Sequence, residues 1–170
     1  SIGNLILAGG YLNNQRQLDP IIFLFSKLVG VKGTVQATVN DNLHLSATLE
    51  DKQIISGQHN MTGKEVSPLI CPIKKIHLVK SIKNKAKEKL VIPIAKASRK
   101  LINTAELICY PPGSFYSSLI ANLLPSGVAI EIANNSCSKV YIPNIGNDPE
   151  QLGMTLDSSV LILLDYLQSK

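Results

Sequence analysis

The stretch Leu107-Ile-Cys-Tyr-Pro-Pro-Gly-Ser-Phe-Tyr-Ser-Ser-Leu119 decides the fold that the sequence predicts. Residues 106–110 hold a run of four apolar residues, 107–110, bounded by turn formers; this run is too short for a helix and predicts a buried strand. Two prolines follow, and because proline has no N–H they end the hydrogen-bonding ladder of that strand. Gly113 permits a sharp corner, and Ser114 is a good N-cap for a helix that runs to about Leu124.

The turn between this strand and this helix gathers hydrogen-bond donors. The amides of residues 113–116 lie at the positive end of the helix dipole, together with the hydroxyls of Ser114, Ser117 and Ser118. Such an arrangement can hold a phosphate or a carboxylate. The alternative is that the glycine and the serine only shape and cap the turn. The Gly-Lys-Ser/Thr of a Walker loop and the glycine spacing of a nucleophile elbow are both absent, which excludes those two motifs.

The order of elements after residue 73 predicts an α/β fold. The expected elements are strand 73–79, helix 93–103, strand 106–110, the helix from Ser114, a second helical piece after residues 125–127, and strand 139–143. This alternation predicts a mostly parallel, Rossmann-like sheet with helices on both faces. The carboxyl ends of parallel strands meet at one edge, so the turn 111–118 and the segment 144–150 should border the same crevice.

The remaining segments complete one domain of 170 residues. Residues 2–12 predict a helix that packs closely through Gly9 and Gly10, and Asp19-Pro20 starts a second helix that ends near Gly30. Residues 32–57 alternate in polarity and predict a small antiparallel β-meander lobe, with strands at 34–39, 43–49 and 53–55. Residues 73–170 form the parallel α/β part, which the final helix 158–168 closes.

Two carboxylates follow the last predicted strand. Asp148 and Glu150 could hold Mg²⁺ beside a phosphate. Asp148-Pro149 also repeats the cap-plus-proline pattern of Asp19-Pro20, so it could instead simply start a helix.

Composition and charge limit the function classes. With 45% apolar and 17% charged residues the chain predicts an ordinary folded domain, and no apolar run is long enough to span a membrane. The net charge of +5 is concentrated in a lysine-rich segment without interleaved aromatic residues, which argues against nucleic-acid binding. The lysines of that segment are Lys74, Lys75, Lys80, Lys83, Lys85, Lys87 and Lys89.

The cysteines and the N-terminus indicate the compartment. Cys71, Cys109 and Cys137 are odd in number and widely spaced, so we expect buried free thiols in a reducing cytoplasm rather than disulfides or a zinc site. Residues 1–4 show no signal-peptide pattern. We expect the chain to begin within a domain. The oligomeric state stays open, a homo-oligomer included.

Four segments, in order, resemble the CofD-like family. They are Ile2-Gly-Asn-Leu-Ile-Leu7, the meander ending Leu49-Glu-Asp with Ser56-Gly57, Ile108-Cys-Tyr-Pro-Pro-Gly-Ser-Phe-Tyr-Ser-Ser118, and Val140-Tyr-Ile-Pro-Asn144. The family includes 2-phospho-L-lactate transferase and the YvcK-type gluconeogenesis factors. The third segment is the most specific, because it is similar to the family's Gly-Pro-Gly-Ser-Leu-Tyr-Thr-Ser signature. The likeness matches only the C-terminal half or so of a family member, so the N-terminal part of the family domain is expected to be absent.

The resemblance implies a ligand that carries phosphate, such as a nucleotide or nucleotide sugar. Its binding residues would be Gly113, Ser114, Phe115, Ser117, Ser118, Asn4 and Asn144, with Asp148 as a metal ligand. Tyr110 and Pro111 depart from the signature, and residues 147–153 differ from the Gly-Glu-Thr segment of the YvcK type, which predicts a divergent subgroup. Two hypotheses follow from the family: a transferase, with Mg²⁺ neutralising charge in phosphoryl-type transfer, or a non-catalytic regulator that binds a nucleotide sugar.

Overall fold

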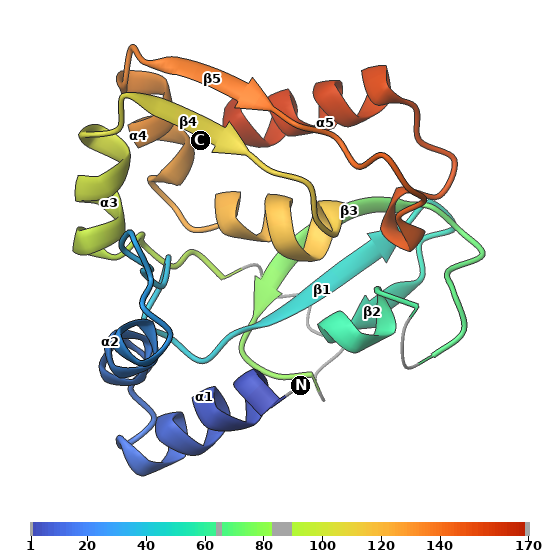
Figure 1. Ribbon diagram of the computed structural model, residues 1–170. Coiled ribbons are helices and arrows are strands. Elements are labelled where there is room, and N and C mark those ends of the chain that lie inside the picture. The colour runs from blue at the N-terminus through green and yellow to red at the C-terminus, as the bar shows by residue number, and fades with distance from the viewer. Residues whose placement is uncertain (1, 64–65, 83–89, 169–170) are drawn as a thin grey trace.

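The computed structural model describes residues 2–63, 66–82 and 90–168 and shows an α/β fold with two small sheets (Figure 1). Its longer elements, in chain order, are α1 (Ile2–Asn13), α2 (Asp19–Leu28), β1 (His44–Leu49), β2 (Ile54–Ser56), β3 (Ile73–Val79), α3 (Lys96–Asn103), β4 (Leu107–Tyr110), α4 (Val128–Asn134), β5 (Ser138–Tyr141) and α5 (Leu156–Gln168). Short helical turns are η1 (Gln58–Asn60), η2 (Phe115–Leu119), η3 (Ile120–Leu123) and η4 (Pro149–Gln151).

Strands β4 and β5 form the parallel sheet that positions the predicted turn. They pair in register from Leu107 opposite Ser138 to Tyr110 opposite Tyr141. The connection between them runs through η2, η3 and α4, which is the crossover that a parallel pair requires. The predicted α/β fold class is therefore confirmed.

A second sheet is antiparallel, with strand order β2-β1-β3. It corrects two predictions. Strand 73–79 was expected in the parallel sheet, but β3 pairs with β1, with Leu45 opposite Leu78 and Ala47 opposite Ile76. These apolar partners are far apart in the sequence, with β2 and η1 between them, so the alternation within each strand does not reveal the pairing.

Residues 34–39 are also not the strand that their alternation predicts. They form an extended segment that runs beside the N-terminus of α3. The amide of Ala95 donates to the carbonyl of Thr38 at 2.9 Å, and the hydroxyl of Ser98 donates to the carbonyl of Ala37 at 2.8 Å. These two contacts satisfy the carbonyls of Ala37 and Thr38 without a ladder partner.

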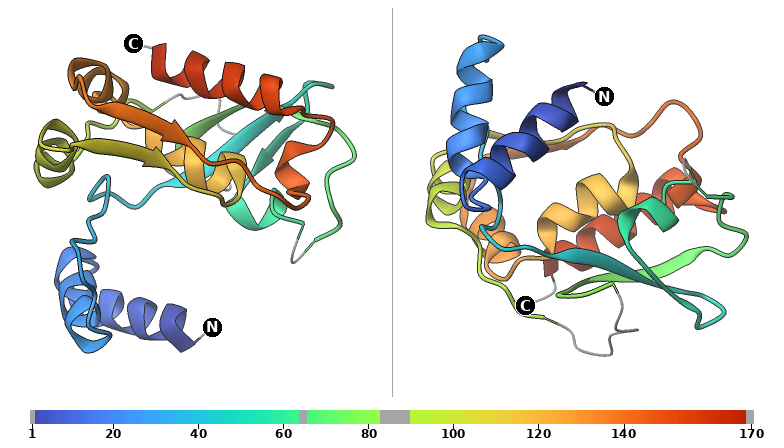
Figure 2. Two further views of the ribbon diagram at one scale, coloured as in Figure 1. Left: turned by 45° about the horizontal axis from the view of Figure 1, so that its top comes forward. Right: turned by 90° about the horizontal axis from the view of Figure 1, so that it is seen from below.

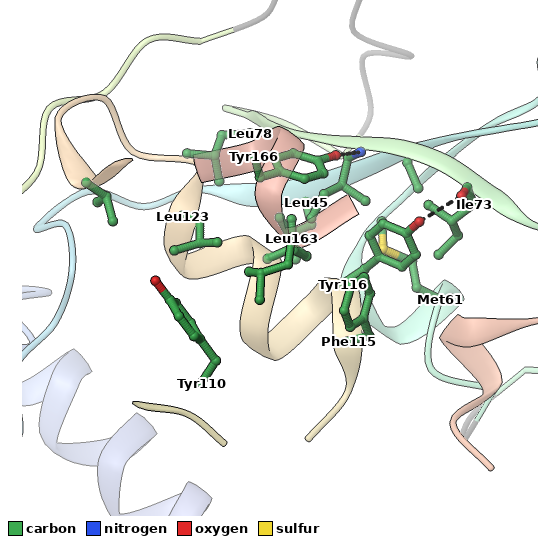
Figure 3. Packing of buried hydrophobic residues seen from close by; sticks show 14 of the residues in the cluster. Leu45, Met61, Ile73, Leu78, Tyr110, Phe115, Tyr116, Leu123, Leu163 and Tyr166 are labelled. Carbon is green, nitrogen blue, oxygen red and sulfur yellow. Dashed lines mark hydrogen bonds between the residues drawn. The ribbon is translucent and has the colours of Figure 1, made fainter. Parts of the chain in front are cut away.

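The core lies where η2 and η3 pack between β3 and α5 (Figure 3). The buried rings of Phe115 and Tyr116 meet edge-on, with their centroids 5.1 Å apart. The Tyr116 hydroxyl donates to the carbonyl of Ile73 at 3.0 Å, and the amide of Ile76 donates to the Tyr166 hydroxyl at 2.9 Å. Burial raises the pKa of Tyr166 to about 12. Two tyrosines thus tie η2 and α5 to one strand.

Helices α1 and α2 extend away from this core (Figure 2). None of the twelve residues of α1, all of which are described, is buried, and α2 buries Ile21 alone of its ten. Gly10 packs directly against Ile21, as the predicted close helix packing requires, whereas Gly9 has open space around it. Among the described residues no helix is long and apolar enough to cross a membrane.

Two further predictions concern the cysteines and the lysine-rich segment. Cys109, expected to be buried, is exposed, while Cys71 and Cys137 are half-buried, and all three thiols are free. Lys83, Lys85, Lys87 and Lys89 of the lysine-rich segment lie outside the described residues.

Candidate functional site

The turn after β4 has the local geometry that the sequence predicts. The strand ends at the buried Tyr110, and Ser114 takes the N-cap position before a helical run from Phe115 to Leu123, but its side chain makes no capping hydrogen bond. The first turn of that run is wound wide, because the carbonyl of Ser114 accepts from the amides of Ser118 at 2.9 Å and Leu119 at 3.2 Å. A π-type turn is rare in proteins overall, and many of the turns that do occur lie at functional sites.

The amides at this turn point at side chains from the segment 144–150. The amide of Phe115 donates to Asp148 Oδ2 at 2.6 Å, and the amides of Tyr116 and Ser117 both donate to Glu150 Oε2, at 2.8 and 2.7 Å. This corrects the expectation that these amides are open to a ligand. Two carboxylates of the protein itself occupy the anion position at the start of the helix.

Asn144 closes the same turn from its other end. The amide of Gly113 donates to Asn144 Oδ1 at 2.9 Å, and Asn144 Nδ2 donates back to the carbonyl of Gly113 at 2.7 Å. The two segments that were expected to border one crevice therefore do meet. They meet through paired hydrogen bonds that fix the loop after β5 onto the turn after β4.

Glu150 is the most unusual residue of the site. Its side chain is 1% exposed, and no described residue bonds to its Oε1 atom or to the neighbouring hydroxyl of Ser117. Burial raises the pKa of Glu150, while the hydrogen bonds that it accepts from Ser117 and Tyr116 pull the pKa down. The two amides at the helix start stabilise the charged form of this carboxylate. Burial removes it from water, however, and this opposes its ionisation.

Asp148 acts as a helix cap. Its Oδ1 atom accepts from the amide of Glu150 at 3.1 Å, so it is the N-cap of η4, with Pro149 at the first position. The interpretation of Asp148-Pro149 as a helix start is confirmed. The described residues contain no group of three or more His, Cys, Asp or Glu side chains that could hold a metal ion.

Two cavities flank the turn. The first, here the Ser118 cavity, has a volume of about 410 Å³ and lies at the carboxyl end of β4; its polar lining includes Thr34, Gln36, Thr38, Gly113, Ser118 and Asn122. The second, the Asn144 cavity, has a volume of about 720 Å³; its polar lining includes Asn144, Asp148, Gln151, Thr155 and Ser159. The turn and its carboxylates form the wall between them.

The predicted binding residues divide among these places. Gly113 and Ser118 line the Ser118 cavity, and Asn144 lines the other. Phe115 and Ser117 are buried in the wall, and Ser114 lines neither cavity. Asn4 lies on α1 and also lines neither.

Most residues of the Ser118 cavity are not among the predicted binding residues, and two of these, Thr38 and Asn122, bond to each other. Thr38 Oγ1 donates to Asn122 Oδ1 at 2.9 Å, a contact that joins the segment 34–39 to the end of η3. Asn122 lies four residues after Ser118, so helical spacing places the two residues on the same face of the predicted helix. In the structure Asn122 Nδ2 donates to the carbonyl of Ser118 at 2.7 Å. For Thr38 the sequence carries no such signal, because the alternation of residues 34–39 predicts a strand of the meander.

The family model for the 2-phospho-L-lactate transferase CofD matches residues 1–170. The chain belongs to the CofD family. The departures of Tyr110 and Pro111 from the family signature are therefore variation within the family, and the turn still forms.

Two similar proteins are named gluconeogenesis factors. The chain is 29% identical over 170 residues to that of Bacillus subtilis and 28% identical over 169 residues to that of Halalkalibacterium halodurans, in each case with 98% of this chain covered. It spans 48% and 47% of their lengths. A crystal structure of a UPF0052 family member from Bacillus halodurans is similar, with a TM-score of 0.79 and 27% identity over 98% of this chain and 50% of that one.

Proposed function

We propose that this CofD-family chain binds a phosphate-bearing ligand, a nucleotide or a nucleotide sugar, in the Ser118 cavity. The observation that carries the proposal is the position of this cavity at the carboxyl end of β4, beside the family's signature turn. Open α/β sheets bind their ligands at that edge. The neighbouring amides are directed at Glu150 and Asp148, so the contacts with the ligand come from the other side of the turn.

The lining of the cavity suits such a ligand. Hydroxyl and amide side chains line one part, and Leu101, Ile102 and Val128 line another. A few placed polar groups against an apolar wall are typical of small-molecule sites, where the apolar part can receive a base or sugar ring. In this proposal the exposed hydroxyl of Ser118 contacts the phosphate, and Gly113 lets the ligand approach the backbone closely.

A second candidate function is regulatory binding without turnover. Two observations favour it: the relatives are named gluconeogenesis factors, and the amides of the signature turn are already bonded to carboxylates. Transferases of phosphoryl-type groups need donors aimed at the group in transfer. In the regulatory form of the proposal, Asp148 holds no Mg²⁺ and remains a cap.

Calorimetric titration with uridine diphosphate glucose and with guanosine diphosphate tests the site. Ser118→Ala should weaken binding about fivefold, because one hydrogen bond is worth about 1 kcal/mol, and Ser118→Leu should abolish binding by filling the cavity. Ser136→Ala is the matched control, since this exposed serine precedes β5 at the opposite end of the sheet. Unchanged affinity in both Ser118 variants would refute the site. Consumption of the bound nucleotide would identify a transferase, and binding without consumption a regulator.

A further inference from the structure

The Ser118 cavity is lined by uncharged side chains. Its described lining residues include no Lys, Arg, His, Asp or Glu, so they offer no ion pair to a charged group that enters the cavity. Taking an unpaired charge out of water is costly, whereas burying an uncharged ring is not. The phosphate of a bound nucleotide should therefore stay at the rim, beside the exposed Gly113 and Ser118, and an uncharged part of the ligand should fill the cavity.

Asn122 presents an oriented carboxamide at this cavity. Its Oδ1 atom accepts from Thr38 Oγ1 at 2.9 Å, and its Nδ2 atom donates to the carbonyl of Ser118 at 2.7 Å. A carboxamide can donate two hydrogen bonds and accept two, and no other described residue bonds to either atom. One N–H and one lone pair of this exposed side chain therefore remain for a ligand.

The two partners of Asn122 fix which end of its carboxamide is nitrogen and which is oxygen. A carbonyl can only accept, so the nitrogen must face Ser118, and the hydroxyl of Thr38 then donates to the oxygen. Thr38 is itself held in place, because the carbonyls of Ala37 and Thr38 accept bonds from the start of α3. Thr38 thus acts as a positioning residue for Asn122.

We propose that Asn122 is a specificity-determining residue that bonds the edge of a nucleobase in the Ser118 cavity. The edge of a base carries a donor and an acceptor side by side, and a side-chain carboxamide can bond both at once. The apolar lining residues Leu101, Ile102 and Val128 suit the faces of the same ring. This inference rests on the proposed function, because it names the part of the nucleotide that the cavity recognises.

Methylated nucleotides test the contact. In uridine diphosphate glucose the N3–H of the base is the donor at its pairing edge, and a methyl group at N3 removes this donor. The natural protein should bind the N3-methyl analogue at least about fivefold more weakly than the parent, as expected for the loss of a paired donor. Asn122→Ala should bind the two about equally. Calorimetric titration measures all four affinities, and guanosine diphosphate with its N1-methyl analogue gives the same comparison for a purine.

A second variant and a control accompany Asn122→Ala. Thr38→Val removes the hydroxyl that orients the carboxamide, so it should reduce the discrimination against the methylated analogue; full discrimination would show that Thr38 does not position Asn122. Asn134→Ala is the matched control, because this exposed asparagine ends α4 and does not line the cavity. It should keep the full discrimination. An equal cost of methylation in the natural protein and in Asn122→Ala would overturn the inference, because Asn122 would then only join η3 to residues 34–38.

The Ser118 variants separate a failure of this inference from a failure of the proposed function. If Ser118→Leu abolishes nucleotide binding but methylation costs the natural protein and Asn122→Ala the same, the cavity is the site and the role of Asn122 is refuted. If nucleotides still bind to Ser118→Leu, or bind to none of these proteins, the site itself is wrong and both proposals fail.

Discussion

At the scale of single residues, the site depends on the carboxylate of Glu150. Its Oε2 atom accepts hydrogen bonds from two amides at the start of a helix, a position that can also bind a free anion. Burial raises its pKa above the ordinary value of 4.5. The folded state therefore binds a proton more readily than the unfolded state does.

Substitution of this residue gives a prediction with a definite sign. Because the pKa is higher in the folded state, the contribution of Glu150 to the free energy of unfolding is greatest at low pH and falls as pH rises above about 4.5. Glu150→Gln keeps an acceptor oxygen but cannot titrate. The stability of the natural protein relative to Glu150→Gln should thus decrease between pH 4 and pH 8. Urea unfolding at several pH values measures this, and parallel curves for the two proteins would contradict it.

Removal of the whole side chain tests the hydrogen bonds instead. Glu150→Ala leaves the amides of Tyr116 and Ser117 buried without an acceptor, which should cost about 2–3 kcal/mol of the free energy of unfolding. Glu106→Ala is the matched control, because Glu106 is exposed at the opposite end of β4. A loss no larger than that of the control would mean that water replaces the carboxylate.

At the scale of elements, the sequence predicts well what is local. The apolar run before two prolines predicts the position of β4 nearly to the residue, but the predicted burial is wrong, because only Tyr110 of its four residues is buried. Ser114 marks the following helix start. The parallel pairing of β4 and β5 also follows from the order of elements. The side chains that bond to these elements from distant parts of the sequence cannot be predicted from local patterns. The acceptor of the Tyr116 amide lies 34 residues away, and nothing in the pattern of residues 113–118 shows that carboxylates fill the turn.

The anchoring of η2 to β3 is an element-scale contact that can be tested. The buried hydroxyl of Tyr116 bonds the carbonyl of Ile73, and burial raises the pKa of this tyrosine strongly. Tyr116→Phe keeps the ring packing but leaves that carbonyl without this donor. The free energy of unfolding should fall by about 1–2 kcal/mol. Tyr11→Phe, on α1, should change it by less than about 0.5 kcal/mol. Equal effects of the two substitutions in urea unfolding would show that the hydroxyl contributes no net stability.

At the scale of the whole molecule, the chain has a packed body and a pair of helices outside it. The buried cluster joins β1, β3, η2, η3 and α5, whereas Ile21 is the one buried residue of α2. The fold of the body should therefore be insensitive to changes between α1 and α2.

Two adjacent glycines of α1 test whether the body folds independently of the packing between α1 and α2. A Cβ atom at Gly10 would overlap the side chain of Ile21 and lie 3.1 Å from its Cβ atom, whereas a Cβ atom at Gly9 meets nothing within 4 Å. Gly10→Ala should thus push α1 away from α2 and speed proteolysis within residues 2–28, while the thermal midpoint of the body stays the same. Gly9→Ala should slow that proteolysis, because alanine favours a helix by up to about 1 kcal/mol over glycine. If Gly10→Ala instead unfolded the body, the packing of α1 against α2 would be part of what holds the core together.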